Sequence, residues 1–350
     1  MTAWRSPTPA PPPTWRDYLL NAGIPMAIAA VAAAGLFVGG PAEYEPPRRG
    51  CARSATDLDG ASSIAVDGGG RVFLAQRFLS EEGCVVRIDN WRVQVVARPG
   101  APVHVQLPAG LAVGDRGELF VGDSEGRRVM RIAPDGRADV VHGGGERATP
   151  VDVAGVAGGD LYLVESFGGR ILKRDPGGRV TLLAGDGFDK PVDGAPARTT
   201  RFSFPDDVAV GPGGDVYIAE NGHQVWRIDT DGRARLVAGT GQRGFAGDGG
   251  PAHAAKLGRL AGVAADEAGN VYISDSDNYR VRRVDRAGII TTIAGTGAPG
   301  LEVGGDGGPA VEAQLSPGDL AVQRGAIYVV DRYNRRVRVI DPAGIIDTLA

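Results

Sequence analysis

Acidic side chains at matched positions are the residues of this chain most able to do chemistry. Asp152, Asp207 and Asp319 each open a short apolar stretch (DVAG, DVAV and DLAV), and Ser63 holds the corresponding position earlier in the chain. A second set closes apolar stretches, and its members are Asp123, Glu165, Glu220, Asp275 and Asp331. Gathered on one face, both sets would make its centre negative and attract cations or basic peptides. The alternative for the second set is that each acid caps backbone N–H groups of its own turn.

Other chemical signatures are weak. The four histidines, His104, His142, His223 and His253, never pair at the i, i+2 or i+4 spacing typical of a zinc site, so we interpret them as scattered surface residues. The glycine-rich string GTGQRG (239–244) follows a strand-like segment but opens no helix, so it does not indicate a dinucleotide site. No nucleophile elbow or P-loop is present in the sequence, and no catalytic residue is predicted.

Six similar runs show what must position the acids. Each run carries an aromatic residue between aliphatic neighbours: Phe73 in RVFLAQ, Phe120 in ELFVGD, Tyr162 in DLYLVE, Tyr217 in DVYIAE, Tyr272 in NVYISD and Tyr328 in AIYVVD. Around each run, four short strand patterns are joined by glycine-bearing turns such as GPGGD and TDGR. Such a unit is one blade of a β-propeller. We therefore predict an all-β fold, a six-bladed propeller of four-stranded antiparallel blades over residues 57–350.

The motif GDGGPA occurs at 247–252 and 305–310, and a degraded copy, VDGAPA, occupies 192–197. All three lie between the fourth strand of one predicted blade and the first strand of the next. Proline can start a single helical turn there, after which Ala255 and Leu257, or Ala313 and Leu315, turn toward the blade edge. Each copy offers one acid (Asp193, Asp248 or Asp306), whereas a calcium loop needs several close together. The motif is therefore interpreted as a joint between blades.

The segment AGVAADEAGNVYISDSDNYRVRRVDRAGIITTIAGTG (261–297) resembles the NHL repeat. The resemblance extends over residues 57–350 and is looser in the first three blades, where Gln76 takes the acidic position and GGRILKRD replaces the usual Asn-x-Arg. It implies a six-bladed ring closed by packing between the last blade and the first. Six-bladed relatives of the gluconolactonase and strictosidine synthase type hold calcium at the channel mouth, which would make Asp152, Asp207, Asp319 and Ser63 its ligands here. An NHL-like zinc lyase needs converging histidines.

The first fifty residues differ from the rest in composition. Residues 1–17 are proline-rich and predicted to be disordered, and residues 18–42 contain no charged residue. The latter segment is predicted to be a transmembrane anchor, with a cleaved signal peptide or a buried helix as alternatives; residues 43–56 form a linker. Outside the cytoplasm Cys51 and Cys84 are expected to form a disulfide, the alternative being two thiols.

The formal net charge of −4 argues against a nucleic-acid partner. Recurring arginines on the third strands are expected on solvated blade surfaces: Arg131, Arg227, Arg282, Arg283 and Arg338. We predict a binding module outside the cytoplasm, held at the membrane as a single-pass protein or secreted if the segment is cleaved. It would recognise a protein, peptide or glycan on the acidic loop face, without a cofactor unless calcium binds. A calcium-dependent lactonase-like hydrolase or a metal-dependent lyase-like enzyme is the alternative.

Overall fold

The computed structural model describes Cys51 and residues 58–78, 83–89, 92–143, 150–155, 159–187, 189–299 and 304–349. These residues belong to the unit of the chain that begins at Arg49. The predicted proline-rich start (1–17), the apolar segment (18–42) and, apart from Cys51, the linker (43–56) lie outside the described residues. Across the described ranges, no helix combines the length and the hydropathy that crossing a membrane requires.

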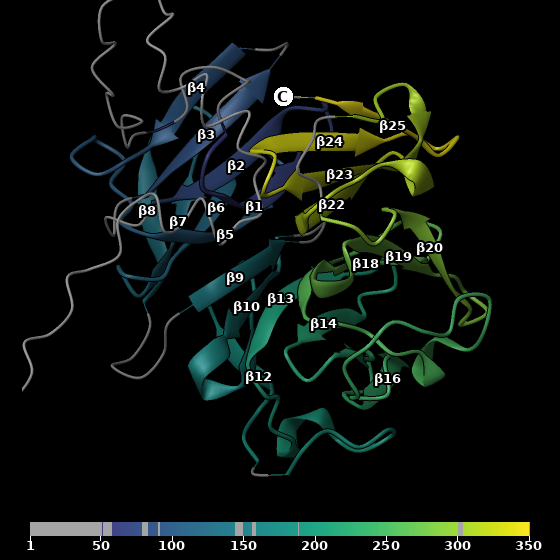
Figure 1. The fold of residues 1–350 in the computed structure, drawn as a ribbon. Coiled ribbons are helices and arrows are strands. Elements are labelled where there is room, and N and C mark those ends of the chain that lie inside the picture. Colours follow the sequence, from purple (N-terminus) through teal and green to yellow (C-terminus); the bar gives the residue numbers. More distant parts are fainter. Residues whose placement is uncertain are drawn as a thin grey trace, which may run out of the picture. The chain divides into compact units, whose positions relative to one another are not determined.

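The described chain forms six antiparallel sheets, each built from strands consecutive in the sequence (Figure 1), and we number them blades one to six. The first strands are β1 (Ala61–Val66), β5 (Pro108–Val113), β9 (Pro150–Gly155), β13 (Pro205–Val210), β17 (Leu260–Ala265) and β22 (Pro317–Gln323). The second strands are β2 (Val72–Arg77), β6 (Leu119–Asp123), β10 (Leu161–Glu165), β14 (Val216–Glu220), β18 (Val271–Asp275) and β23 (Ala326–Asp331). The six aromatic runs of the sequence thus supply the second strands, as predicted.

Two further strands complete each blade. The third strands are β3 (Gly83–Asp89), β7 (Arg128–Ile132), β11 (Arg170–Arg174), β15 (Gln224–Ile228), β19 (Arg280–Val284) and β24 (Arg336–Ile340). The fourth strands are β4 (Arg92–Ala97), β8 (Ala138–Gly143), β12 (Val180–Ala184), β16 (Ala234–Ala238), β20 (Ile290–Ala294) and β25 (Ile345–Thr348). Blade six adds β21 (Gly308–Pro309) on the outer side of β25. The prediction of an all-β, six-bladed propeller with four-stranded blades is confirmed.

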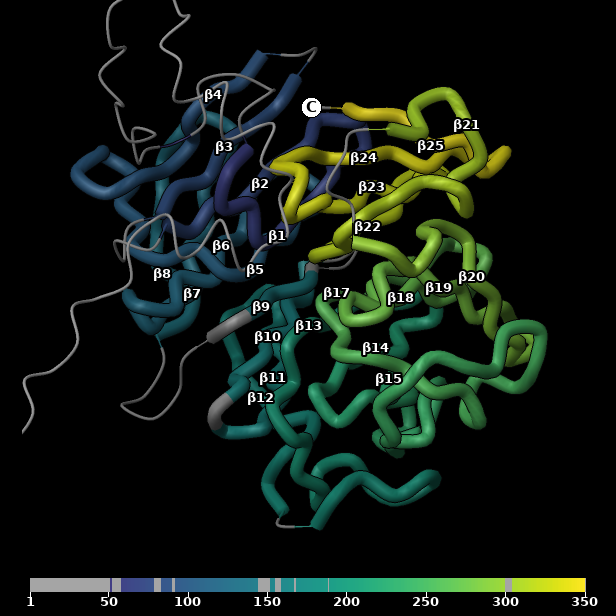
Figure 2. Tube along the Cα trace, in the orientation of Figure 1, coloured from purple at the N-terminus to yellow at the C-terminus, as the bar shows by residue number. Residues whose placement is uncertain are grey.

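The first strands of the blades surround a common centre (Figure 2). Each contacts the first strand of the following blade, and β22 of blade six contacts β1 of blade one. The ring closes by face packing, because Val330 and Val337 of blade six share a buried cluster with Leu58 and Leu74 of blade one. No strand is exchanged between blades among the described residues. Closure therefore takes the form that the sequence predicted.

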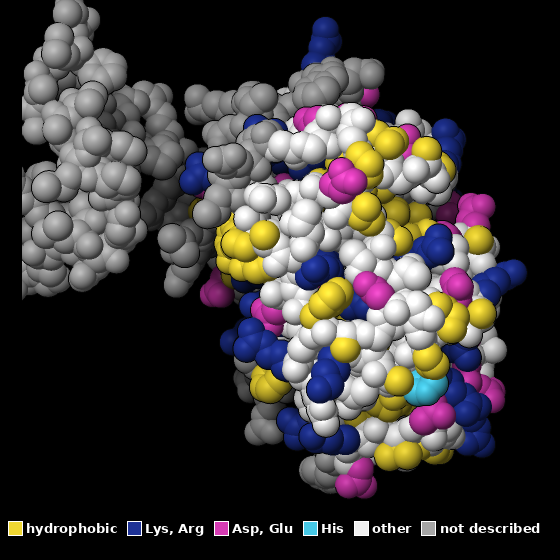
Figure 3. Space-filling model, turned by 45° about the vertical axis from the view of Figure 1, so that its right-hand side comes forward, with side chains coloured by type: hydrophobic (Ala, Val, Ile, Leu, Met, Phe, Trp, Pro, Cys, Tyr) yellow, Lys and Arg dark blue, Asp and Glu magenta, His cyan; other side chains and the backbone are white. Residues whose placement is uncertain are grey.

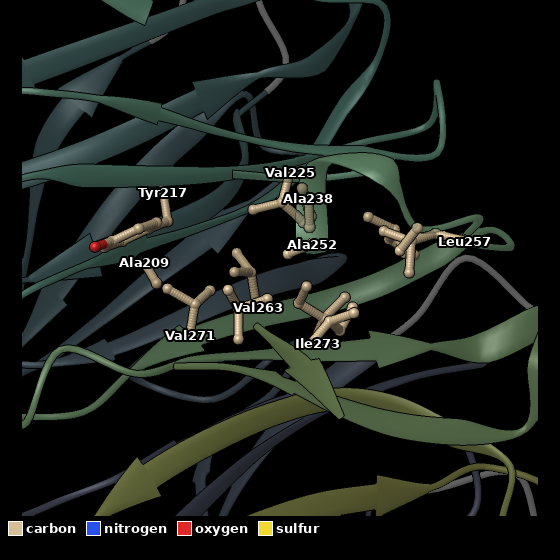
Figure 4. Close-up of a cluster of buried hydrophobic side chains, with 14 residues drawn as sticks. Ala209, Tyr217, Val225, Ala238, Ala252, Leu257, Val263, Val271 and Ile273 are labelled. Carbon is tan, nitrogen blue, oxygen red and sulfur yellow. The ribbon is translucent and has the colours of Figure 1, made fainter. Parts of the chain in front are cut away.

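The core consists of apolar layers between neighbouring blades. In Figure 4, Ala209 of blade four lies beside Val271 of blade five, and Tyr217, Val263 and Ile273 belong to the same buried cluster. Alternate residues of a strand point to opposite faces, so a blade covered on both faces can bury both sets. Burial of apolar surface contributes about 25 cal/mol per Å². These layers are therefore the main source of stability and the frame that fixes the loops.

Strand pairing gives the propeller two distinct ends. Pro205 at the start of β13 pairs with Glu220 at the end of β14, whereas Val210 pairs with Val216 at the other end. Connections between blades therefore emerge on the same side as the loops between second and third strands. We call this side the loop face. The opposite side carries the turns between first and second and between third and fourth strands, and we call it the turn face.

Candidate functional site

The first acidic set joins neighbouring blades around the centre of the ring. In each case a carboxylate of one blade accepts a backbone N–H from the next: Val208 N to Asp152 Oδ2 (2.9 Å), Val263 N to Asp207 Oδ2 (2.5 Å) and Ile64 N to Asp319 Oδ2 (2.9 Å). All three aspartates are buried. Each of these bonds crosses from one blade to the next and satisfies a backbone N–H group at a buried site. These acids therefore fasten blades three to four, four to five, and six to one.

Glycine at the same position in two other blades gives the carboxylates room. A Cβ atom on Gly110 would contact Asp152, and one on Gly262 would lie 3.0 Å from Asp319 Oδ1. Blade one has Ser63 instead, and its hydroxyl lies close enough to Asp319 to lower the pKa of that carboxyl. Each of these aspartates thus has one of two kinds of neighbour at the matching position of an adjacent blade. The neighbour is either a small residue or a second carboxyl group that shares a hydrogen bond with it.

The ionised forms of these acids are disfavoured. Burial, and then the charge of Asp152, raise the pKa of Asp319 from 3.8 to about 7. Burial, and then the charges of Asp152 and Asp319, hold the pKa of Asp207 well above 3.8, and burial raises that of Asp152. The Asp152 and Asp207 carboxyl groups also share a hydrogen bond. The cluster therefore keeps protons at a pH where exposed carboxyl groups have lost them.

A metal site would need several ligand atoms to converge. In the part of the chain that the structure describes, no three His, Cys, Asp or Glu side chains are arranged to hold a metal ion. Two of the histidines have backbone partners: His223 Nδ1 lies 2.8 Å from the carbonyl oxygen of Gly258, and His104 Nδ1 accepts the N–H of Gly100 at 3.1 Å. The predicted ligand set of Asp152, Asp207, Asp319 and Ser63 sits together, but its carboxylates face the N–H groups of neighbouring blades. Calcium binding there stays a prediction.

The second acidic set is buried beneath the loop face. The exposed fractions of Asp123, Glu165, Glu220, Asp275 and Asp331 lie between 0% and 4%. Four of them accept a backbone N–H of the connection that leads into the same blade: from Leu107, Ser203, Gly258 and Ser316, respectively, to Asp123, Glu220, Asp275 and Asp331. These acids therefore cap backbone groups of the incoming connection, whereas the alternative given above placed each cap in the acid's own turn, as in the bond from Gly126 N to Asp123 Oδ1 (3.2 Å). The negative surface that the sequence suggested is absent here, because these carboxylates point into the protein.

Each joint covers the outer edge of the blade that it precedes. Gly249 N donates to Ile290 O (2.8 Å), and Ile290 N donates to Gly250 O (3.0 Å), so the joint lies along β20 of blade five. In blade six the same segment forms β21 and pairs with β25, and in blade four Gly194 N donates to Ala234 O (2.8 Å). An exposed edge strand invites pairing with other chains. The repeated motif therefore closes the edges of the last three blades.

The helical turn after the joint proline is confirmed. The turns η2 (Ala197–Thr199), η3 (Ala252–Ala254) and η5 (Ala310–Glu312) each follow a proline, whereas η1 (Ser166–Gly168) and η4 (Ser276–Asn278) follow second strands. Downstream, Ala255, Leu257, Ala313 and Leu315 are buried, as predicted. The turn thus lets the chain pass from the outer edge of a blade toward its first strand.

The acid of the joint has a buried partner. Arg282 Nη2 donates to Asp248 Oδ1 (2.7 Å), and its Nη1 lies 3.4 Å from Asp275 Oδ2. In blade six Arg338 makes the corresponding pair with Asp306 at 2.7 Å. These two arginines are 0% and 1% exposed. The prediction that they lie on solvated blade surfaces is wrong, because the joint folds over the outer half of the blade and supplies a carboxylate to a side chain it covers.

Blade four shows what the degraded joint lacks. Its third strand carries buried Trp226 where the last two blades carry arginine. Asp193, the acid of this joint, instead accepts the backbone N–H of Leu236 (3.0 Å). The joint therefore keeps its edge-covering role in blade four without an ion pair.

The loop face is hollowed at the mouth of the central channel. A cavity of about 130 Å³ lies there, and its walls include Arg77, Asp206, Arg259 and Arg332. The buried carboxyl groups of Asp152, Asp207 and Asp319 form its floor. The channel continues below as a narrow space of about 190 Å³ between the six first strands. The mouth is therefore a small polar pocket framed by arginines.

The three arginines were not among the residues predicted from the sequence. Arg77 and Arg332 directly follow Gln76 and Asp331, which occupy the acid position of their blades, while Arg259 directly precedes β17. The sequence does contain a signal for two of them. Neighbouring side chains on a strand point to opposite faces, so the residue after a buried capping side chain points away from it. The prediction of a negative centre considered only the acidic residues, whereas the exposed charges at the mouth include these three arginines.

A larger cleft, of about 890 Å³, lies on the turn face between blades three, four and five. Two of its acids have basic partners: Asp160 pairs with Lys173 at 2.6 Å, and Asp229 pairs with Arg235 at 3.1 Å. Figure 3 shows basic and acidic side chains interspersed over one face of the molecule, so neither sign forms a continuous field in that view. The two ion pairs reduce the charge that this cleft offers to a ligand.

Cys51 and Cys84 lie together as thiols, not as a disulfide. The hydrogen bond from the neighbouring Cys51 thiol, and then burial, raise the pKa of the Cys84 thiol. Cys84 is fully buried in the cluster between blades one and six, and Cys51 packs against that cluster. The structure thus brings together the two residues that the sequence paired, and the covalent bond remains a prediction.

We expect the two cysteines to cross-link when the chain is exported or treated with oxidant. Their proximity should make Cys51–Cys84 the disulfide found by non-reducing peptide mapping, and the bond should raise the free energy of unfolding by about 3 kcal/mol. The matched control is Cys51→Ser, which should unfold at the same urea concentration with and without reductant. Both thiols remaining reactive toward a maleimide in the exported chain would contradict the prediction.

The geometry defines the class of protein, a six-bladed β-propeller with a polar channel mouth. Residues 227–302 match the family model of the Teneurin NHL domain. The chain is an NHL-repeat β-propeller. It is 30% identical over 171 residues to Protein SUPPRESSOR OF QUENCHING 1, chloroplastic, of Arabidopsis thaliana, a match that covers 45% of this chain and 16% of the plant protein. This chain therefore corresponds to a minor part of that relative.

Solved structures share the fold at low identity. An auxiliary nutrient binding protein from Bacteroides thetaiotaomicron superposes with a TM-score of 0.61 at 16% identity, covering 84% of this chain and 70% of that one. A virginiamycin B lyase from Staphylococcus aureus gives a TM-score of 0.55 at 14% identity, covering 85% and 86%. Both are similar in architecture alone.

Proposed function

We propose that this protein is a membrane-tethered binding module whose propeller lies outside the cytoplasm and recognises a protein, peptide or glycan on the loop face. The observation that carries the proposal is the channel mouth, where side chains from blades one, four, five and six line one small pocket. Small-molecule sites are concave, with a few convergent polar groups. An auxiliary nutrient binding protein shares the propeller architecture, which is compatible with a binding role.

Exposed aromatic side chains on the loop face support a ligand larger than the pocket. Phe204 is 56% exposed and Tyr333 is 66% exposed. Phe204 lies in the connection that enters blade four, two residues before Asp206, and Tyr333 follows Arg332. Aromatic residues combine a large contact area with little conformational freedom, which makes them frequent anchors at binding surfaces. The ligand would then fill the mouth and extend over its rim.

Peptide and glycan arrays probed with the full-length chain in mild detergent would test this function. We expect binding to a subset of ligands, weakened about tenfold or more by Tyr333→Ala and Phe204→Ala, which remove rim anchors. The matched control is Tyr162→Phe, which removes only a hydroxyl at the turn-face cleft. Binding that depends on the turn face, or no ligand on either array, would refute the proposal. A reporter fused after Arg49 that is active only in the cytoplasm would refute the location.

A further inference from the structure

Three arginines converge on the channel mouth from neighbouring blades. Arg77 ends β2 of blade one, Arg259 precedes β17 of blade five, and Arg332 follows β23 of blade six. Blades five, six and one are consecutive in the closed ring, because β17 contacts β22 and β22 contacts β1. All three side chains line the same pocket of about 130 Å³. The pocket is thus bordered on one side by three guanidinium groups from distant parts of the sequence.

These guanidinium groups have no partner within the described residues. None of the three takes part in an ion pair or a side-chain hydrogen bond there, whereas other loop-face arginines are paired: Arg128 with Asp123 at 3.2 Å and Arg170 with Glu165 at 2.5 Å. Asp206 shares the pocket without forming an ion pair in this part of the chain. A guanidinium group carries five N–H donors suited to oxyanions. Their hydrogen-bonding capacity is therefore free for a ligand.

Burial and mutual repulsion disfavour the charged forms of the arginines at the mouth. Burial lowers the pKa of Arg77 and of Arg332, and the charges of Arg259 and Arg77 lower that of Arg332 further, against the opposing effects of Asp319 and Asp206. Gly318 leaves room for the Arg332 side chain, because a Cβ atom there would lie 2.6 Å from Arg332 Nε. Like charges that repel one another in a pocket are relieved by an anion.

The buried aspartates beneath offset only part of the positive charge of the cluster. Their carboxylate oxygens accept backbone N–H groups of the neighbouring blades, as described above. Burial also favours their protonated, neutral forms. The floor of the pocket therefore removes less of the positive charge than the number of aspartates suggests.

We propose that Arg77, Arg259 and Arg332 form an oxyanion-binding subsite that takes a side-chain carboxylate of an acidic peptide segment, while Tyr333 and Phe204 contact the flanking residues. This inference rests on the proposed function of the loop face and names the chemistry of its ligand. The volume of the pocket suits one small group such as a carboxylate. Because the protein carries a net charge of −4, it repels acidic peptides in general, and binding requires this local cluster.

The test uses the full-length chain with a fluorescein-labelled hexaglutamate peptide and its hexaglutamine counterpart, measured by fluorescence anisotropy. We expect hexaglutamate alone to bind. Arg77→Gln, Arg259→Gln and Arg332→Gln should each weaken binding about tenfold or more, as loss of a hydrogen bond to a charged group does, and the triple variant should abolish it. The control triple variant, Arg116→Gln/Arg286→Gln/Arg324→Gln, changes the net charge equally but lies in turn-face turns, and it should bind like the unmodified chain.

Several outcomes would overturn the inference: equal binding of the two peptides, no binding of either, or equal effects of the two triple variants. Inorganic phosphate separates the two oxyanion sources. Phosphate that binds through the same arginines while hexaglutamate does not would overturn the assignment to an acidic peptide. A ligand found on the arrays that still binds the loop-face triple variant, yet is lost in Tyr333→Ala, would refute this subsite and leave the proposed function standing. The single variants keep the test valid if the triple variant fails to fold.

Discussion

Replacing Arg282 by alanine is expected to lower the free energy of unfolding by about 3–5 kcal/mol. The side chain is 0% exposed and lies between Asp248 at 2.7 Å and Asp275 at 3.4 Å. Its removal leaves the buried Asp275 carboxylate without its cationic partner and opens a cavity the size of a guanidinium side chain. Asp275 keeps its bonds from Gly258 N and Asn278 Nδ2, so the lower half of that range is expected.

Urea unfolding followed by circular dichroism would measure this loss. The matched control is Arg283→Ala at the next position of β19, because Arg283 is half-buried and has no ion pair in the described ranges; it should cost less than about 1 kcal/mol. Arg338→Ala should repeat the effect in blade six at a smaller size, since its distance to Asp331 is 3.8 Å. Equal unfolding midpoints for Arg282→Ala and Arg283→Ala would show that the buried pair contributes nothing.

The stability of the propeller is expected to fall as the pH rises from about 4 to about 7. Asp319 titrates near 3.8 in the unfolded chain and at about 7 in the folded one. Within that window the folded state binds more protons than the unfolded state, so raising the pH favours unfolding; below it both states are protonated, and above it the loss is complete. A shift of this size corresponds to roughly 4 kcal/mol. The raised pKa of Asp207 acts in the same direction.

Asp319→Asn isolates this contribution. The amide cannot ionise, and its oxygen can still accept the N–H of Ile64, although Leu320 N loses its acceptor at a cost of about 1 kcal/mol. The difference in unfolding free energy, variant minus unmodified chain, should therefore increase with pH between about 4 and 7. Asp139→Asn is the control, because Asp139 is 51% exposed, and its difference should stay constant. Parallel curves for Asp319→Asn and the unmodified chain would contradict the prediction.

The fold was predictable because its signals are local. An aromatic residue between aliphatic ones indicates each second strand, and glycine indicates each turn. The number of aromatic runs therefore predicts six blades. The joint between blades was predicted from the position of proline and from small residues such as Ala255 and Ala313, which let the chain pack closely against the blade edge. These features depend on residues near one another in sequence, which a single sequence displays directly.

The site was less predictable because its contacts cross between segments. Arg282 is buried in an ion pair with Asp248, and Asp248 lies in the connection between blades rather than in a turn next to the Arg282 strand. Strand alternation indicates that a side chain faces outward from its blade, but it does not show that a joint will cover that surface. The mouth likewise combines Arg77 with Arg332 from opposite ends of the propeller sequence, and ring closure alone brings them together.

The covering of each outer edge by the preceding joint defines the natural building block of the last three blades. A block that runs from GDGGPA to the end of the fourth strand contains both the edge and the segment that covers it, because the joint pairs with β20 or β25 of its own block. Tandem duplication of that block adds a blade whose edge is already shielded, whereas a copy starting at the first strand would leave it bare. Lengthening or shortening this propeller by whole units is therefore best done by cutting just before the glycine of the joint.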